Sequence, residues 1–251
     1  IENIISYYSD LDITVIGSYS AIEIVKNNPK VVKTIVLDSK IKSLYISYTE
    51  LGFFDVYFTF RGSIRAKLLK FTVKAKKKYQ FNHKNYPYRH QVEKYVDFIN
   101  HSLSSNYPAG NLINHFNRLK HKESSRLLGI NPGASYGSAK RWYPEQFAKI
   151  AIALSDKFDI IIFGGVGEQD FAQQIENFLL NKNILNYRNL AGKTSISELT
   201  NYISNLDIFV TGDSGPMHLA ASLQIPTIAI FGPTNAIETS QWKNVNSIII
   251  K

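Results

Sequence analysis

The chain has 251 residues, of which 44% are hydrophobic, and a net charge of +9 at pH 7. This length and composition exclude a fibrous or disordered protein and allow one large or two modest globular domains. Because the sequence has no cysteine, it has no disulfide framework, no thiolate nucleophile and no cysteine-based zinc site. The positive charge favours an anionic partner, such as nucleic acid, an acidic membrane surface or a phosphorylated small molecule.

Hydrophobicity along the chain gives no sign of a membrane span or a leader. No run of about 18 apolar residues occurs, and the first residues, "IENIISYYSDLDITVIG", lack the charged region and cleavage site of a signal peptide. We therefore expect a protein of the cytoplasm.

The first half of the chain predicts an α/β pattern. Apolar β-branched runs indicate strands at 12–17, 34–38 and 55–60, separated by "SAIEIVKNN" and "SLYISYTELGF". Apolar spacing of three and four indicates a helix at 89–103. The polar stretch 104–126, which contains a Pro-Ala-Gly break, is the best candidate for a linker.

A cluster of basic residues lies in "RAKLLKFTVKAKKK", and its members are Arg65, Lys67, Lys70, Lys74, Lys76, Lys77 and Lys78. If the stretch is helical, Lys70, Lys74 and Lys77 share one side. Such a side is either a solvated helix face or a surface that attracts anionic lipid or a phosphorylated acceptor.

The second half alternates short buried strands with amphipathic helices. Strands are predicted at 127–131, 158–164, 206–212, 227–232 and 247–250, and helices at 144–156, 168–181, 195–205 and 215–224. This alternation specifies a parallel sheet covered on both faces. We predict an α/β protein of two Rossmann-like domains, at 1–110 and 127–251, joined by a linker at 111–126. Ligands of such domains bind at the carboxyl ends of the strands.

The stretch "TGDSGPMHLAAS", residues 211–222, resembles the loop around the nucleophilic serine of a trypsin-type protease. A serine nucleophile needs a base within reach, and no separate Asp–His pair accompanies Ser214. Since this serine lies at a predicted strand-to-helix turn, its hydroxyl and the free backbone N–H groups suit a phosphate, and Gly215 allows a close approach. The simpler alternative is that Asp213 or Ser214 caps the helix, and the two roles are compatible.

Two further loops follow predicted strands. The loop after Asn131 offers the Ser135 hydroxyl and the cations of Lys140 and Arg141, as a phosphate loop would, while Trp142 either walls a ligand or packs on the helix start. In "FGGVGEQD", Glu168 either accepts hydrogen bonds from ribose hydroxyls or offsets the helix charge. Together the three loops predict a nucleotide-diphosphate site.

Two long motifs, "TGDSGPMHLAASLQIPTIAIFGPTN" and "NPGASYGSAKRWYPEQFAKIA", resemble those of the ADP-heptose:lipopolysaccharide heptosyltransferases, glycosyltransferase family 9, and are most similar to the heptosyltransferase II branch. "FDVYFTFRGSIRAKLL" is also similar to the amino-terminal half of that family. The resemblance implies a GT-B architecture, with two Rossmann-like domains facing a cleft. It also implies inverting transfer of L-glycero-D-manno-heptose from ADP-heptose to the Kdo or first heptose of the lipopolysaccharide inner core.

Positions in the motifs carry roles over from the family. The resemblance implies that Ser135, Lys140, Ser214 and Gly215 hold the diphosphate and that Glu168 holds the ribose. The segment "LAGKTSI", residues 190–196, is similar to the family's loop beside the adenine, with Thr194 as a backbone contact. The resemblance further implies that Asp213 and His218 contact or orient the heptose. It implies no cofactor and no metal. The family's expected catalytic base is an Asp in an amino-terminal Gly-Asp loop that would lie upstream of Ile1. Asp10, Asp38 and Asp55 do not match it, so the catalytic residue stays unassigned.

On the acceptor side, Arg61, Ser63 and Arg65 follow a predicted strand end and could pair with anionic Kdo or core phosphate, although they are equally consistent with unliganded surface residues. The basic cluster would fit peripheral contact with the anionic cytoplasmic face of the bacterial inner membrane. Nucleic acid is not an expected partner, because no RNP or zinc-finger pattern occurs. The alternatives are another GT-B transferase or an epimerase with a different nucleotide sugar, or a nucleotide- or nucleic-acid-binding module.

Overall fold

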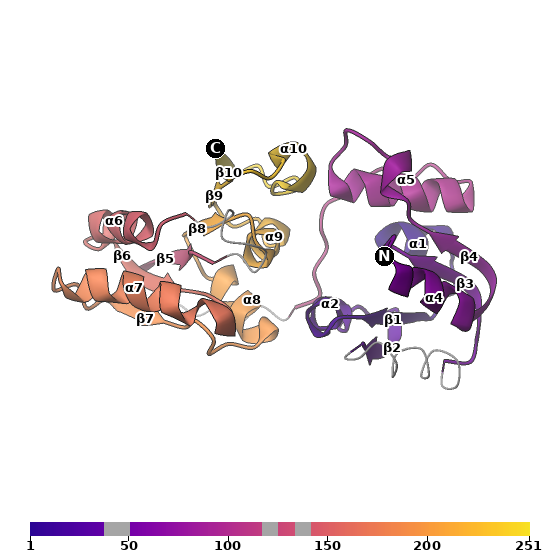
Figure 1. Ribbon diagram of the computed structural model, residues 1–251, viewed down its shortest axis with the longest axis horizontal. Helices are drawn as coiled ribbons and strands as arrows, with labels where there is room; N and C mark the ends of the chain where they lie inside the picture. The colour runs from indigo at the N-terminus through magenta and orange to yellow at the C-terminus, as the bar shows by residue number, and fades with distance from the viewer. Residues whose placement is uncertain (38–50, 117–124, 134–141) are drawn as a thin grey trace. The chain divides into compact units, whose positions relative to one another are not determined.

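The computed structural model describes residues 1–37, 51–116, 125–133 and 142–251. The chain divides into two compact units, Ile1–Gly110 and Asn111–Lys251, here called unit 1 and unit 2. Both units are built from parallel sheets with helices packed on them (Figure 1). This confirms the α/β class with parallel sheets that the sequence predicts.

Unit 2 contains a six-stranded parallel sheet. Its strand order is β10 (Ser247–Ile250), β9 (Thr227–Ile230), β8 (Ile208–Gly212), β5 (Arg126–Asn131), β6 (Phe158–Ile162) and β7 (Tyr187–Asn189). The first strand in sequence, β5, therefore lies in the middle, between β6 and β8. This is the doubly wound order, and the switch between the two winding directions falls between β5 and β8.

Helices cover both faces of this sheet (Figure 1). On one face, α6 (Pro144–Leu154) and α7 (Gln169–Leu180) pack on alternate strand residues such as Leu128 and Ile130. On the other face, α8 (Ile196–Ser204) and α9 (Gly215–Ser222) pack on the intervening ones, such as Leu127 and Ile161. Because side chains alternate along a strand, burial on both faces requires the continuous apolar runs that the sequence shows.

Unit 1 has two separate two-stranded parallel sheets, β1 (Ile13–Gly17) with β2 (Val31–Val36) and β3 (Phe53–Thr59) with β4 (Lys74–Gln80). Its helices are α1 (Glu2–Tyr7), α2 (Tyr19–Val25), α4 (Ile64–Thr72) and α5 (Gln91–Leu103) among the described residues. Its core is aromatic. Phe81, which precedes α5 in the sequence, and Phe98, within α5, make edge-to-face contact at 5.7 Å between ring centroids.

Most predicted elements of the described residues are confirmed, with ends shifted by a few residues. Lys70, Lys74 and Lys77 would share one side only if the whole basic stretch were helical, and it is not, because α4 ends at Thr72 and Lys74 and Lys77 belong to strand β4. Hydrogen bonding to the parallel neighbour β3 stabilises the extended form there. The short strand β7, the helix α1 and the four-residue α10 (Ala236–Thr239) were not predicted. The predicted linker is described only up to Phe116 and from Ser125.

Candidate functional site

Asn131 links the ends of the two central strands of unit 2. It is the last residue of β5, is 1% exposed and pairs in register with Thr211 of β8. Its Nδ2 lies 3.3 Å from the Thr211 hydroxyl, 3.2 Å from the Ser214 hydroxyl and 3.3 Å from the Gly133 carbonyl oxygen. One buried amide thus donates to both loops that leave the sheet at its switch point. Sequence reasoning assigned no role to Asn131, although a polar residue closing the apolar run "LLGIN" was a usable signal.

Ser214 occupies the N-cap position of α9, but its side chain makes no capping hydrogen bond. Its hydroxyl instead lies 3.1 Å from that of Thr211, in addition to its contact with Asn131. The side-chain capping alternative is therefore wrong for Ser214, because its hydroxyl accepts no hydrogen bond from the backbone N–H groups at the α9 start. Neither neighbour of the hydroxyl is a base, which argues against a serine nucleophile.

The residues around Ser214 differ in exposure. Gly215 is exposed, and a Cβ added to it would meet no atom of the described residues within 4 Å, so these residues leave the space beside the α9 N-terminus open. Asp213, just before the α9 N-cap, is 6% exposed, whereas His218, four residues after Ser214 within α9, is exposed. A helix N-terminus with an open approach and a hydroxyl attracts a phosphate through its dipole and unpaired N–H groups.

Glu168 connects the loops after β5 and β6. It is 8% exposed, and its Oε2 accepts the Gly165 N–H at 2.7 Å, which caps the 3-10 turn Val166–Glu168 that precedes α7; its side chain makes no capping hydrogen bond to α7 itself. A Cβ on Gly133 would lie 2.1 Å from the Glu168 Cδ and 2.3 Å from each carboxylate oxygen. The carboxylate therefore lies directly against the β5 loop, at the same sheet edge as Asn131. A carboxylate has lone pairs beyond the one used by Gly165, which ribose hydroxyls could occupy.

The loop after β7 is attached to the loop after β6. The Gly192 N–H donates to the Gly164 carbonyl at 2.8 Å, and the Gln169 amide donates to the Ala191 carbonyl at 3.4 Å. Thr194 is half-buried and directly precedes Ser195, whose hydroxyl caps α8 by accepting the Glu198 N–H at 3.2 Å. This cap fixes the backbone just after Thr194.

Ser135, Lys140 and Arg141 lie outside the described residues. Trp142 directly follows them, and its ring packs edge-to-face on Phe147 at 5.3 Å between centroids. Since Tyr143 is the N-cap of α6, these two rings hold the positions of a hydrophobic staple. The packing alternative for Trp142 is the one that the structure shows.

The three acceptor-side candidates lie in unit 1, around the start of α4. Ser63 is the N-cap of α4, and its hydroxyl accepts the Ala66 N–H at 3.3 Å. The Arg61 carbonyl accepts a hydrogen bond from the Gln80 amide at 3.1 Å, which ties the loop to the end of β4. Arg65 is half-buried, whereas Arg61 and Ser63 are exposed.

Residues 55–251 match the family described as glycosyltransferase family 9 (heptosyltransferase). The chain is 38% identical over 253 residues to lipooligosaccharide heptosyltransferase 2 of Campylobacter jejuni, which covers 97% of this chain and 78% of that protein. The structure of E. coli ADP-heptose LPS heptosyltransferase II matches with a TM-score of 0.81 at 19% identity, over 99% of this chain and 84% of that one. The E. coli heptosyltransferase WaaC with ADP matches with a TM-score of 0.78 at 15% identity, over 99% and 86% of the two chains.

The two structural matches confirm the GT-B type of α/β fold that the motifs imply. The family match covers most of the chain and includes every element of unit 2 described above. The chain therefore belongs to glycosyltransferase family 9, the heptosyltransferases.

Proposed function

We propose that the protein is an inverting heptosyltransferase that moves L-glycero-D-manno-heptose from ADP-heptose to the first heptose of the lipopolysaccharide or lipooligosaccharide inner core. One observation carries the proposal. At the switch point of the sheet, the buried Asn131 amide contacts both the Ser214 hydroxyl at the α9 N-terminus and the Gly133 carbonyl of the β5 loop. Family membership and the 38% identity to a heptosyltransferase 2 favour ADP-heptose as the donor.

In this proposal, unit 2 holds the nucleotide. Ser214, Gly215, Ser135 and Lys140 bind the diphosphate, since they supply hydroxyls, an open helix N-terminus and a cation. Glu168 accepts the ribose hydroxyls with the carboxylate lone pairs that Gly165 does not use. Thr194 contacts the adenine through a backbone that the α8 cap holds in place. Asp213 and His218 contact the heptose.

The chemistry is a single displacement at the anomeric carbon of the heptose. The bond from this carbon to the diphosphate oxygen breaks while a bond to the acceptor hydroxyl oxygen forms on the opposite face. Negative charge grows on the departing ADP, and the N–H dipoles of the α9 start together with the charge of Lys140 would stabilise it. The acceptor hydroxyl loses its proton to a base that we do not assign to any residue of this chain.

The acceptor is anionic and lipid-linked, so we place the enzyme at the cytoplasmic face of the inner membrane, with Arg61, Ser63 and Arg65 on the Kdo or core phosphate groups. Among the helices that the structure describes, none combines the length and the apolar character needed to cross a bilayer. A peripheral attachment would then rest on surface side chains of unit 1.

Isothermal titration with ADP-heptose, ADP-mannose and UDP-GlcNAc tests the donor assignment. We expect ADP-heptose to bind most tightly and ADP-mannose to retain the nucleotide part of the affinity. Preference for the UDP-sugar would overturn the proposal in favour of another GT-B transferase or an epimerase. Salt-sensitive binding to a generic DNA duplex with no sugar-nucleotide binding would instead indicate a nucleic-acid-binding module.

A further inference from the structure

The outward face of helix α4 is apolar. Ala66 and Leu69 point into unit 1 and are 5% and 7% exposed, as expected for a helix packed on its sheet. On the opposite side, Ile64, Leu68 and Phe71 are 77%, 47% and 83% exposed. Their spacing of four and three places them in one row along the helix. Single exposed apolar residues are ordinary, but a row of three large ones on one helix face marks an interaction surface.

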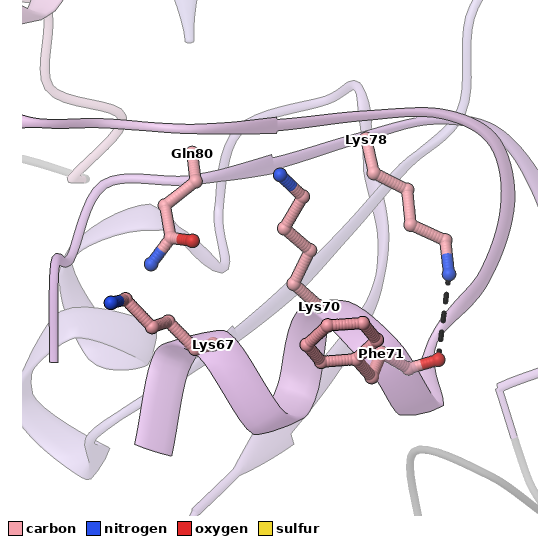
Figure 2. A pocket seen from close by; sticks show the side chains of 5 residues that line it. All are labelled: Lys67, Lys70, Phe71, Lys78 and Gln80. Atoms are coloured by element: carbon pink, nitrogen blue, oxygen red, sulfur yellow. Dashed lines mark hydrogen bonds between the residues drawn. The ribbon is translucent and has the colours of Figure 1, made fainter. Parts of the chain in front are cut away.

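Cationic side chains flank this row on the side of β4. Lys67 and Lys70 extend from α4 toward β4, and together with Phe71, Lys78 and Gln80 they line a hollow of about 430 Å³ (Figure 2). The Lys78 ammonium donates to the Phe71 carbonyl at 3.5 Å, where it also meets the negative end of the α4 dipole. None of the described residues that line the hollow is acidic, and the carboxylate of Asp55 on β3 pairs with Lys76 at 2.6 Å rather than with a lining lysine.

We propose that the face formed by Ile64, Leu68, Phe71, Lys67, Lys70 and Lys78, here called the α4 face, docks the protein on a bilayer with anionic headgroups. The three apolar side chains enter the boundary between headgroups and acyl chains, and headgroup phosphates occupy the hollow beside Lys67 and Lys70. This inference rests on the proposed function, since a lipid-linked acceptor is what makes a membrane partner useful.

Charge and polarity together favour a bilayer over other occupants. An apolar row bordered by lysines is the pattern of helices that lie in a membrane interface. A second copy of the chain, docked through the same face by a twofold axis, would bring one lysine cluster against another. A nucleic acid would suit the lysines but not three exposed aliphatic and aromatic side chains.

Docking through the α4 face would also place the acceptor-side residues at the membrane. Ser63 is the N-cap of the same helix and Arg65 its second residue, on either side of Ile64 in the sequence. The lipid-linked acceptor would therefore reach these residues without leaving the bilayer surface.

Co-sedimentation with vesicles tests this proposal, using phosphatidylcholine alone and phosphatidylcholine mixed with phosphatidylglycerol. We expect binding only with the anionic lipid. Phe71→Ser should weaken it about tenfold or more, because a buried aromatic side chain is lost. Lys67→Glu with Lys70→Glu should weaken it by at least about 25-fold, because each lysine near an anionic surface contributes about fivefold.

Matched controls separate the α4 face from net charge and general hydrophobicity. Lys157→Glu with Lys182→Glu changes the net charge equally on exposed positions of unit 2, and Val245→Ser removes an apolar side chain that is 87% exposed. We expect both controls to bind the anionic vesicles nearly as the unchanged protein does. Equal loss in the controls, or no loss in the α4-face variants, would overturn the proposal. So would a dimer in solution that Phe71→Ser dissociates while vesicle binding is absent.

A second readout distinguishes failure of this inference from failure of the proposed function. Transfer of heptose to a water-soluble core oligosaccharide without acyl chains needs no bilayer, so Phe71→Ser should leave it unchanged. If neither the unchanged protein nor Phe71→Ser transfers heptose but vesicle binding follows the pattern above, the proposed function fails and the proposal for the α4 face stands. If heptose is transferred but the protein does not bind the anionic vesicles, the proposal for the α4 face fails and the proposed function stands.

Discussion

Replacing Gly133 by alanine tests how closely the β5 loop and Glu168 are packed. The new Cβ would lie 2.1 Å from the Glu168 Cδ, so the carboxylate has to move away from the β5 loop. Moving it breaks the 2.7 Å hydrogen bond from the Gly165 N–H to Oε2. Hydrogen bonds to charged groups contribute roughly 1.5–3 kcal/mol to stability. The reduced backbone freedom of the unfolded alanine chain offsets about 0.5 kcal/mol of that loss.

We therefore expect Gly133→Ala to lower the free energy of unfolding of unit 2 by about 1.5 kcal/mol, which is roughly a 4 °C fall in Tm for a unit of this size. If Glu168 binds ribose, the displaced carboxylate should also weaken ADP binding by about tenfold or more, since 1.4 kcal/mol is one decade in Kd. Thermal unfolding followed by circular dichroism and isothermal titration with ADP measure the two effects.

A double-mutant cycle with Glu168→Ala separates this contact from a general effect of alanine. Without the carboxylate, Gly133→Ala should cost little further stability, which gives a coupling of roughly 1.5 kcal/mol. Gly167→Ala, in the turn after β6 that also holds Glu168, is the matched control, because its Cβ would meet no atom of the described residues within 4 Å. Unchanged Tm and ADP affinity in Gly133→Ala, or an equal loss in the Glu168→Ala background, would refute this reasoning.

Three further substitutions test other contacts. Asn131→Asp removes the two N–H donors that the amide shares among the Gly133 carbonyl and the Thr211 and Ser214 hydroxyls, and it adds a negative charge beside the proposed diphosphate. ADP affinity should therefore fall about 100-fold or more by titration; a small change would contradict the role of Asn131. Ser214→Ala removes one hydroxyl and should weaken ADP binding by about tenfold while the Tm changes little. The hydrogen bond from the Arg89 guanidinium and that from the His90 N–H hold the pKa of Glu93 below its ordinary value of 4.5, against burial, which raises this pKa. A carboxyl whose pKa is lowered in the folded state stabilises the fold above its ordinary pKa, and this contribution is lost as the pH falls through the folded pKa. Glu93→Gln should therefore destabilise unit 1 at neutral pH and not at a pH of about 2. An equal loss in the free energy of unfolding at both pH values, measured by chemical unfolding, would oppose this.

The sheet of unit 2 could be predicted well because its central strands are buried on both faces. A mostly apolar run such as "FDIII" does not alternate apolar with polar residues, as a strand with one solvent-exposed face would, and it forms β6 as expected. The edge strand β7 was missed because Tyr187–Asn189 is short and polar, and its extended form depends on pairing with β6. The basic stretch after Thr72 was misread for a related reason. Its lysines gave no apolar periodicity, and pairing with β3 decides its structure.

The site could be predicted in its residue types but not in its contacts. The motifs identified Glu168 and Ser214, and the structure places their loops at one sheet edge. That the Glu168 carboxylate lies against Gly133 depends on the β5 and β6 loops meeting across the sheet, which no local pattern reveals. The donor role of Asn131 likewise depends on the register between β5 and β8.

Mass spectrometry of the acceptor tests the central claim most directly. The protein would be incubated with ADP-heptose and either a Kdo-only core oligosaccharide or one that already bears the first heptose. We expect the heptose-bearing acceptor to gain one heptose and the Kdo-only acceptor to remain unchanged. No gain with either acceptor, together with transfer of a sugar from UDP-GlcNAc, would contradict the assignment of this protein as an ADP-heptose-dependent heptosyltransferase.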